Sequence, residues 1–315
     1  MPNVTGMGTV WNLPNYAGEL FTADTTNTPI LSAIGGMTGG LQTENFEFAT
    51  DSQYSFPAAK QPEISETASL TAPVAQEIAR TQNTNVTQIF HETLSISYAK
   101  MSNAGRMSGL NTAGQKNNAP SEKDFQIART LEKIARDIEY TIINGTYQKS
   151  TSSEVANKTR GLLELCSTIN TITGESTPIL TKEMMNALFK KMYDNGAIFK
   201  NLVLYTNSTQ KQIITSLYTI APQSRNVGGS NIQQIETDFG NIGIQLNRFM
   251  PQDKVLAAEL SVMAPVFQPT PEKGNFFYES LAKKGASEDG QIFGQFGLDH
   301  GPGFMHGSIT GLKAE

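Results

Sequence analysis

The sequence contains a single cysteine among its 315 residues, so no disulfide can form within the chain and a reducing compartment is compatible with it. Cys166 lies in the apolar run 161–166, a setting that favours a buried, unreactive thiol over a nucleophile. No apolar run approaches the ~20 residues that a membrane-spanning helix needs. The first residues show neither the basic region nor the apolar core of a signal peptide. We therefore expect a protein that has no membrane partner and is not exported.

Charge is scarce as well, because charged residues make up 17% of the chain and the net charge is -5. Proteins that bind nucleic acid tightly usually carry a basic stripe, since neutralising phosphates supplies much of their affinity. Here adjacent lysines occur only as isolated pairs, such as 190–191 and 283–284. The pattern predicts no tight nucleic-acid site, but it is compatible with a protein that lines a DNA-filled space without gripping the DNA.

Histidines number only three, which leaves little material for a metal site. A zinc-protease helix would need a second histidine four residues after His91, where Ser95 stands, and the segment has strand patterning. We therefore interpret His91 as a strand residue with one solvated face. His300 and His306 flank a Gly-Pro-Gly turn, with Asp299 nearby, and they alone do not form a ligand set.

Motifs of enzyme active sites are missing too. The segment 109–117 resembles a phosphate-binding loop, but Gln115 stands where that loop has its lysine, and Asn117 replaces the hydroxyl that holds magnesium. No nucleophile elbow, dinucleotide-binding loop or carboxylate pair is identified from spacing. The sequence thus predicts a protein that is not an enzyme, with no catalytic, cofactor-binding or metal-binding residues and no cofactor.

What is present begins with a turn-rich segment at residues 1–45, in which proline and glycine delimit one short helix at 29–34. Aromatic residues then alternate with polar ones between Phe46 and Phe56, which is typical of a strand. Residues 57–83 hold few large apolar side chains and cannot build a core. We interpret them as a long excursion from the body, followed by two strands at 86–90 and 93–98.

The strongest single pattern predicts a helix over residues 121–144. Ser121 is a suitable N-cap, with Asp124 three positions on, and Gly145 follows the last helical residue. Glu132 and Arg136 are spaced for an ion pair one turn apart. The apolar residues recur every three or four positions: Phe125, Ala128, Leu131, Ile134, Ala135, Ile138 and Ile142.

The second half alternates helices and strands and then becomes rich in strands. Capping residues and apolar spacing predict helices at 181–195 and 208–218, with a buried strand at 202–205 between them. Further strands are predicted at 243–247, 255–260, 291–296 and 307–312. The chain is therefore expected to be an α+β protein.

This order of elements resembles that of tailed-phage major capsid proteins of the HK97 fold, and more narrowly that of the SU10-type major head protein family. Four blocks carry the resemblance and follow one another along nearly the whole chain. They are residues 26–35 with 44–51, residues 131–145 with 159–162, residues 236–251, and the tail from 281–285 to 311–312.

The resemblance implies an HK97-like capsid fold with four parts. These are an N-terminal arm at 1–45, an extended loop at 46–100, a peripheral domain at 101–180 plus 263–315 that contains the spine helix 121–144, and an axial domain at 181–262. A polar two-stranded excursion without a core becomes stable when a neighbouring copy pairs with it. Contacts of this kind close into rings of copies.

The function implied is that of a major capsid protein, which assembles into pentamers and hexamers of an icosahedral shell around double-stranded DNA. The DNA would be enclosed without sequence-specific binding. Portal, scaffolding or decoration proteins are further partners, and we expect any scaffold to be a separate protein. The chain would belong to the virion capsid and assemble in the bacterial host cytoplasm.

Two other structural functions stay open at this point. An encapsulin-like compartment shares the fold and encloses cargo instead of a genome, whereas a tail-tube or other virion protein would form rings or tubes. One relative crosslinks its subunits through lysine and asparagine, but we find no matching motif. Arg80 and Arg106 are candidates for ion pairs with Glu63 and Glu66 of a neighbouring copy.

Overall fold

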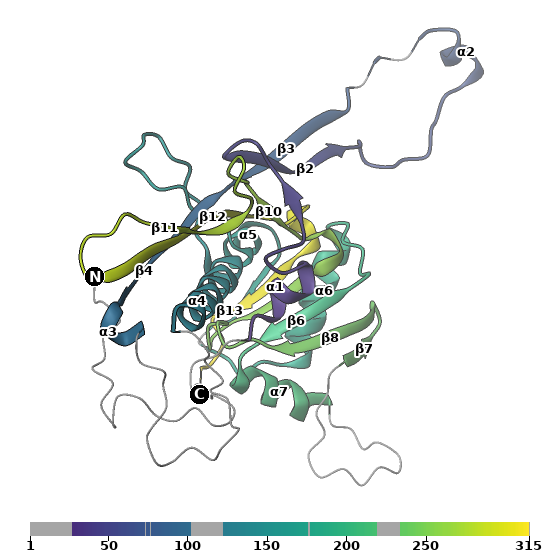
Figure 1. Ribbon diagram of the computed structural model, residues 1–315. Coiled ribbons are helices and arrows are strands. Elements are labelled where there is room, and N and C mark those ends of the chain that lie inside the picture. The colour runs from purple at the N-terminus through teal and green to yellow at the C-terminus, as the bar shows by residue number, and fades with distance from the viewer. Residues whose placement is uncertain are drawn as a thin grey trace.

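The computed structural model describes residues 27–72, 74–75, 77–101, 122–175, 177–218 and 234–314. Most of the predicted N-terminal arm, Arg106 and the segment compared with a phosphate loop lie outside these ranges. The described chain forms a body with two β-sheets, from which a long two-stranded loop projects (Figure 1). The mixed α+β composition predicted from the sequence is confirmed.

The long helix is present as α4 (Glu122–Asn144). Ile134, Ile138 and Ile142 are fully buried, and their spacing of four residues places them on one face of the helix. That face packs against α5 (Leu162–Ile169) and against the larger aromatic and aliphatic side chains of a five-stranded sheet. The predicted N-cap, Ser121, lies outside the described residues.

One predicted contact on α4 is wrong. Glu132 forms its ion pair with Arg129, at 2.8 Å and one turn earlier, and not with Arg136. The Nε of Arg136 is buried, so that side chain lies against the body, whereas Arg129 is half exposed and reaches Glu132 across the helix surface.

The end of α4 is fixed by a close approach of two backbone segments. A Cβ on Gly145 would lie 2.5 Å from the Thr141 carbonyl oxygen, and one on Gly161 would lie 2.5 Å from the Gly145 nitrogen. The Gly161 N–H donates to the Gly145 carbonyl oxygen at 2.9 Å. Gly145 was predicted as a helix stop, and its lack of a side chain is also what lets α5 begin beside α4.

The five-stranded sheet is organised around one long strand. The predicted strand at 291–296 is part of β12, which pairs with β4 on one side and with β10 and β11 on the other. The parallel strand β1 completes this sheet at the edge of β10. The bounds are β1 (Leu41–Gln42), β4 (Gln88–Ser97), β10 (Ala264–Phe267), β11 (Phe276–Ser280) and β12 (Ser287–Asp299).

The two strands predicted at 86–90 and 93–98 need correction. The first strand, β3 (Ala79–Val86), ends at Val86, and after Thr87 strand β4 runs without a break through the polar residues that suggested a gap. His91 and Glu92 do not interrupt β4, because each of their side chains contacts a polar residue at the surface of the sheet. His91 contacts Gln291 at 3.0 Å, and Glu92 pairs with Lys133 of α4.

The second sheet has six strands in the order β5-β13-β9-β6-β8-β7, and it includes the predicted strands at 202–205, 243–247, 255–260 and 307–312. The predicted helices at 181–195 and 208–218 are confirmed as α6 and α7, and the Thr181 hydroxyl caps α6 by accepting the Met184 N–H. The bounds are β5 (Thr171–Thr173), α6 (Lys182–Asp194), β6 (Leu202–Thr206), α7 (Ser208–Tyr218), β7 (Gln234–Thr237), β8 (Gly240–Leu246), β9 (Val255–Glu259) and β13 (Gly307–Thr310).

Short elements join these layers. The predicted helix at 29–34 is confirmed as α1 (Pro29–Ile34), which Gly35 ends with a φ of 126° that favours glycine. The sequence did not indicate α3 (Tyr98–Met101) or the 3-10 turns η1 (Leu260–Val262) and η2 (Gly303–Met305). These elements are too short for their apolar residues to show a helical period.

Candidate functional site

Within the described ranges no three His, Cys, Asp or Glu residues gather closely enough to hold a metal ion. Cys166 is fully buried, as predicted, and burial raises the pKa of its thiol far above the usual value. His91 is exposed on β4, as the strand interpretation predicted.

The other two histidines are buried and structural. The Glu259 N–H donates to Nδ1 of His306 at 3.2 Å, so Nε2 carries the proton and donates to the His300 carbonyl oxygen at 2.6 Å. Asp299 accepts the Gly301 N–H at 3.0 Å and closes the same turn. Burial lowers the pKa of His306 to about 4, and this neutral ring ties the turn to the end of β9.

This burial predicts a pH dependence. Because the folded pKa of His306 lies below the unfolded value of 6.5, its contribution to stability is fully present above pH 6.5 and is lost as pH falls towards 4. Relative to a His306→Gln variant, the wild-type chain should lose about 3 kcal/mol of unfolding free energy over that interval. Denaturant unfolding at a series of pH values measures the difference. If the difference in unfolding free energy between the two chains stayed the same from pH 6.5 to pH 4, this prediction would be contradicted.

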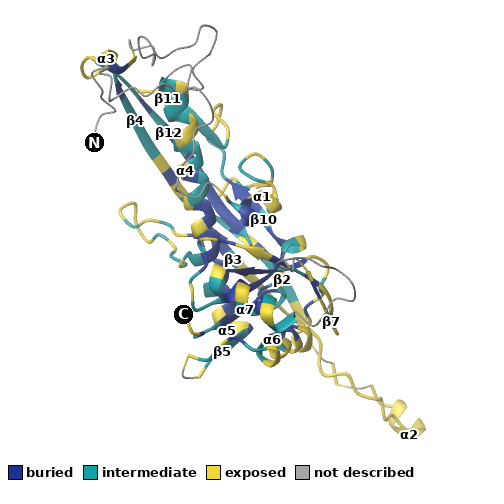
Figure 2. Cartoon of the chain, turned by 90° about the horizontal axis from the view of Figure 1, so that it is seen from below, coloured by how far each residue is buried: buried dark blue, intermediate teal, exposed yellow. Residues whose placement is uncertain are grey.

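The most unusual surface is the projecting part of the extended loop, formed by β2 (Glu47–Ser55), β3 and the connection between them. All described residues from 56 to 78 are exposed, and this stretch holds only the short helix α2 (Glu66–Ser69), capped by the Ser65 hydroxyl (Figure 2). Large apolar side chains are nonetheless present there, which is uncommon on a surface that stays in water. They are Phe56, Ile64, Leu70, Val74 and Ile78, between 46% and 91% exposed.

The base of this loop is held firmly. Asn85 is fully buried and its amide donates to the Leu298 carbonyl oxygen at 2.8 Å, while its Oδ1 accepts the N–H groups of Val86 and Arg160 at 2.9 and 2.8 Å. Thr87, the next residue but one, bonds to Gln268 at 2.9 Å. A buried side chain with these partners has one orientation, so the direction in which the loop leaves the body is set by its base.

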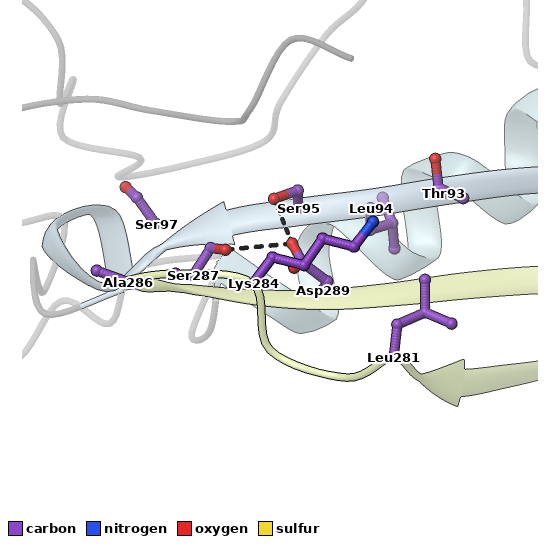
Figure 3. Close-up of a pocket in the computed structure, with 10 residues that line it drawn as sticks. Thr93, Leu94, Ser95, Ser97, Leu281, Lys284, Ala286, Ser287 and Asp289 are labelled. Carbon is purple, nitrogen blue, oxygen red and sulfur yellow. Dashed lines mark hydrogen bonds between the residues drawn. The ribbon is translucent and has the colours of Figure 1, made fainter.

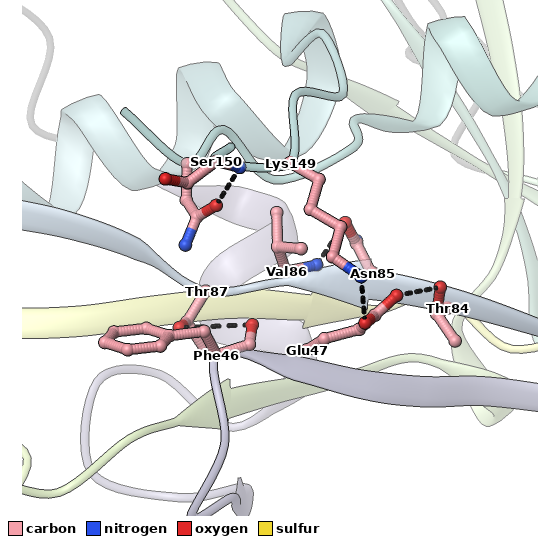
Figure 4. A network of polar contacts seen from close by, with 9 residues as sticks. Phe46, Glu47, Thr84, Asn85, Val86, Thr87, Lys149 and Ser150 are labelled. Carbon is pink, nitrogen blue, oxygen red and sulfur yellow. Dashed lines mark hydrogen bonds and ion pairs between the residues drawn. The ribbon is translucent and has the colours of Figure 1, made fainter. Parts of the chain in front are cut away.

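A second set of contacts at the base is more exposed. Lys149, on the segment after α4, pairs with Glu47 at the start of β2, and Glu47 also accepts the Thr84 hydroxyl at 2.9 Å (Figure 4). The ion pair with Lys149 lowers the pKa of Glu47. A pair this exposed to solvent contributes little stability. The cavity beside it, about 760 Å³ in volume, lies between the loop base and residues 149–158.

A buried carboxylate connects α1 to the rest of the body. Glu139 of α4 accepts the N–H groups of Ile30 and Leu31 at 2.9 and 2.8 Å, and the side-chain amide of Asn247 at 2.6 Å. Burial is the main cause that raises its pKa, and the three hydrogen bonds oppose that shift. Glu139 thereby fixes the start of α1 against α4 and against the segment that follows β8.

A second cavity, of about 580 Å³, lies at the far end of the β4–β12 pair, where the chain turns from β11 to β12 (Figure 3). The exposed residues Lys283 and Lys284 belong to that turn. Within the described ranges each helix is too short or too polar to span a lipid bilayer.

Comparison with protein families gives one match that covers almost the whole chain. A family described as SU10 major capsid protein matches residues 3–313. No curated protein matches the sequence.

Solved structures with the same fold share little sequence. The capsid of cyanophage A-1(L) is similar with a TM-score of 0.64 and 10% identity, over 98% of this chain and 99% of that one. A structure from Microbacterium phage Oxtober96 gives 0.58 and 13%, over 93% of both chains. The holo-SrpI encapsulin complex from Synechococcus elongatus PCC 7942 gives 0.53 and 10%, again over 93% of both. The fold is that of HK97-like capsid proteins.

Proposed function

Because the chain belongs to the SU10 major capsid protein family, we propose that its copies join into pentamers and hexamers through their extended loops. The protein is a tailed-phage major capsid protein, a structural component of the virion that forms an icosahedral shell. The fold alone is shared with an encapsulin, and it is the family match that separates the two functions.

The observation that carries the proposal is the exposure of all described residues from 56 to 78, together with the apolar side chains among them. A two-stranded ribbon without a core is marginal in water and gains stability by lying on another surface. Asn85 holds its base rigidly, so each copy presents the loop in the same direction. Identical contacts repeated by rotation close into rings.

Within each copy we propose the four parts expected from the sequence. The arm is 1–45, the extended loop 46–100, the peripheral domain 101–180 plus 263–315, and the axial domain 181–262. In the extended loop, β2, β3 and their connection leave the body, whereas β4 pairs with β12 along its length. Strands β5 and β13, at the margins of the peripheral domain, pair with each other and β13 pairs with β9 of the axial domain.

Further partners belong to the same proposal. The shell encloses double-stranded DNA without sequence-specific binding, in keeping with the net charge of -5. Portal, scaffolding and decoration proteins contact it at other surfaces, and assembly takes place in the bacterial host cytoplasm.

Sedimentation and negative-stain electron microscopy of the purified chain test this proposal. We expect rings with five and six copies, or closed shells made from them. Tubes would favour a tail protein, and a monodisperse monomer or dimer at every salt and crowding condition would contradict assembly by this chain alone. Cargo protein in place of nucleic acid inside particles from cells would favour a compartment.

A further inference from the structure

The turn at residues 300–306 connects the two sheets, because it joins the end of β12 to the start of β13. It packs closely on α5, since a Cβ on Gly303 would lie 2.6 Å from Cδ1 of Ile169. The side-chain amide of Asn170 donates to the His306 carbonyl oxygen at 2.9 Å. The turn is thus held on the end of α5 as well as between the sheets.

His306 ties this turn to β9 while its ring is neutral. Nδ1 accepts the Glu259 N–H at 3.2 Å and carries no proton, whereas Nε2 donates to the His300 carbonyl oxygen at 2.6 Å. A proton added at Nδ1 would point a second donor at the Glu259 N–H, so this hydrogen bond exists only with the neutral ring. The ring is completely buried, and the new N–H group would have no solvent to bond to.

His300 has the same constraint at the other end of the turn. Its Nδ1 lies 2.7 Å from the Gly301 carbonyl oxygen, which can only accept, so Nδ1 carries the proton and Nε2 is bare. Nε2 is buried and has no hydrogen-bond partner among the described residues. A proton taken up there would create a buried donor without an acceptor. Both rings therefore fit the folded turn only when they are neutral.

The charged groups near His300 act against each other. Burial is the main cause that lowers the pKa of His300, and its hydrogen bond to Gly301 opposes this shift. Arg160 lowers the pKa further, and Asp51 raises it. The carboxylate of Asp299 already accepts the Gly301 N–H at 3.0 Å. The net effect favours the neutral ring.

The surroundings of His306 also favour a neutral ring. Burial lowers its pKa to about 4, the bond to the His300 carbonyl oxygen opposes this shift, and a charge on His300 would add to it. On β9 and α5, the charged side chains are Glu259 and Glu164, and backbone N–H groups engage both carboxylates. Lys200, on the segment after α6 that contacts η2, is exposed. Two protonated rings in this turn would therefore repel each other, while the carboxylates of β9 and α5 are already engaged.

We propose that the turn at residues 300–306 is an acid-sensitive joint, which detaches from β9 and α5 when its two histidine rings take up protons, while both sheets stay folded. In the open turn, Nδ1 of His306 and Nε2 of His300 reach water and can carry their protons without an unsatisfied donor. The joint works within a single copy, so it goes beyond the proposed function and does not depend on assembly.

The direction of the effect follows from the lowered pKa values. The closed turn binds fewer protons than the open turn, so opening becomes easier as pH falls below 6.5. For His306 alone, a pKa of 6.5 in the open turn and of about 4 in the closed turn raises the equilibrium constant for opening roughly 100-fold between pH 7 and pH 4.

Amide hydrogen exchange of the full chain, followed by mass spectrometry at pH 7 and pH 4, tests the joint. The N–H groups of Met305, His306 and Ser308 are hydrogen-bonded in the closed turn or directly after it. Their exchange at each pH is compared with that of the same peptide in the unfolded chain. Protection of residues 300–308 should fall roughly 100-fold at pH 4, while the paired residues of β4 and β12 keep their protection.

Histidine variants separate the joint from other effects of acid. Gln offers one acceptor and one donor but takes up no proton, so His306→Gln should remove most of the fall in protection. His300→Gln with His306→Gln should abolish it. His91→Gln, on the exposed histidine of β4, is the matched control and should leave the fall unchanged. Circular dichroism checks that each variant is folded at pH 7.

Three results would overturn the proposal. The first is equal protection of the turn at pH 7 and pH 4 in the unmodified chain. The second is a loss of protection in both sheets together with the turn, which would be general unfolding. The third is an equal fall in the folded double variant. The first two need no substitution, so the test stands even where a variant does not fold.

Discussion

Replacing residues 56–78 by an Asn-Gly turn is expected to give a chain that folds normally but forms no shells. Ser55 and Ala79 are register partners in the β2–β3 pair, so a two-residue turn can join them and keep the hairpin. None of the described residues removed is buried. The unfolding free energy should therefore change by no more than about 1 kcal/mol, whereas the contact between copies is lost completely.

Circular dichroism, denaturant unfolding and sedimentation measure these two effects separately. As a matched control, removal of residues 151–154, an exposed turn on a different segment, should leave assembly intact. Shells of normal size from the loop-replaced chain would show that the loop is not the joining element.

Substitution of Glu139 by leucine is expected to destabilise the body by about 2–5 kcal/mol. The N–H groups of Ile30 and Leu31 and the amide of Asn247 would each lose a buried acceptor. Relief of the cost of burying the carboxylate offsets part of this loss. Unfolding is best measured in the loop-replaced chain, since assembly would otherwise add to the apparent stability.

The same site has a pH dependence opposite to that of His306. Burial raises the folded pKa of Glu139 above 4.5, so its contribution to stability is fully present below pH 4.5 and is lost as pH rises through the folded pKa. Glu139→Gln does not titrate. The stability of the wild-type chain relative to this variant should therefore fall as pH rises. A relative stability that increases with pH would mean that the three hydrogen bonds outweigh burial.

The elements predicted from the sequence are those with strong local signals. Proline at the start of α1, the isoleucine spacing of α4 and the Thr181 cap of α6 each act within a few residues. Helix α5 was not predicted, because its N-cap is Gly161, which has no side chain to serve as a start signal. Strands β1 and β11 were not predicted, because β1 has only two residues and β11 begins with three consecutive aromatic residues, so neither shows a period of two.

The exposed loop was predicted because residues 57–83 contain few large apolar side chains, and this can be read from the composition of the segment alone. The hydrogen bonds that hold the base of the loop and helix α1 to the body could not be predicted. Asn85 bonds to a carbonyl group 213 residues away, and Glu139 bonds to backbone groups 109 and 108 residues away. A cavity formed where β4 meets the turn before β12 likewise depends on pairing that no local pattern contains.

Cryo-electron microscopy of the assembled particle tests the central claim most directly. The account predicts a closed icosahedral shell in which residues 56–78 of each copy lie on the adjacent copy of the same ring. A particle in which these loops extend into solvent, or lie only on their own copy, would contradict it.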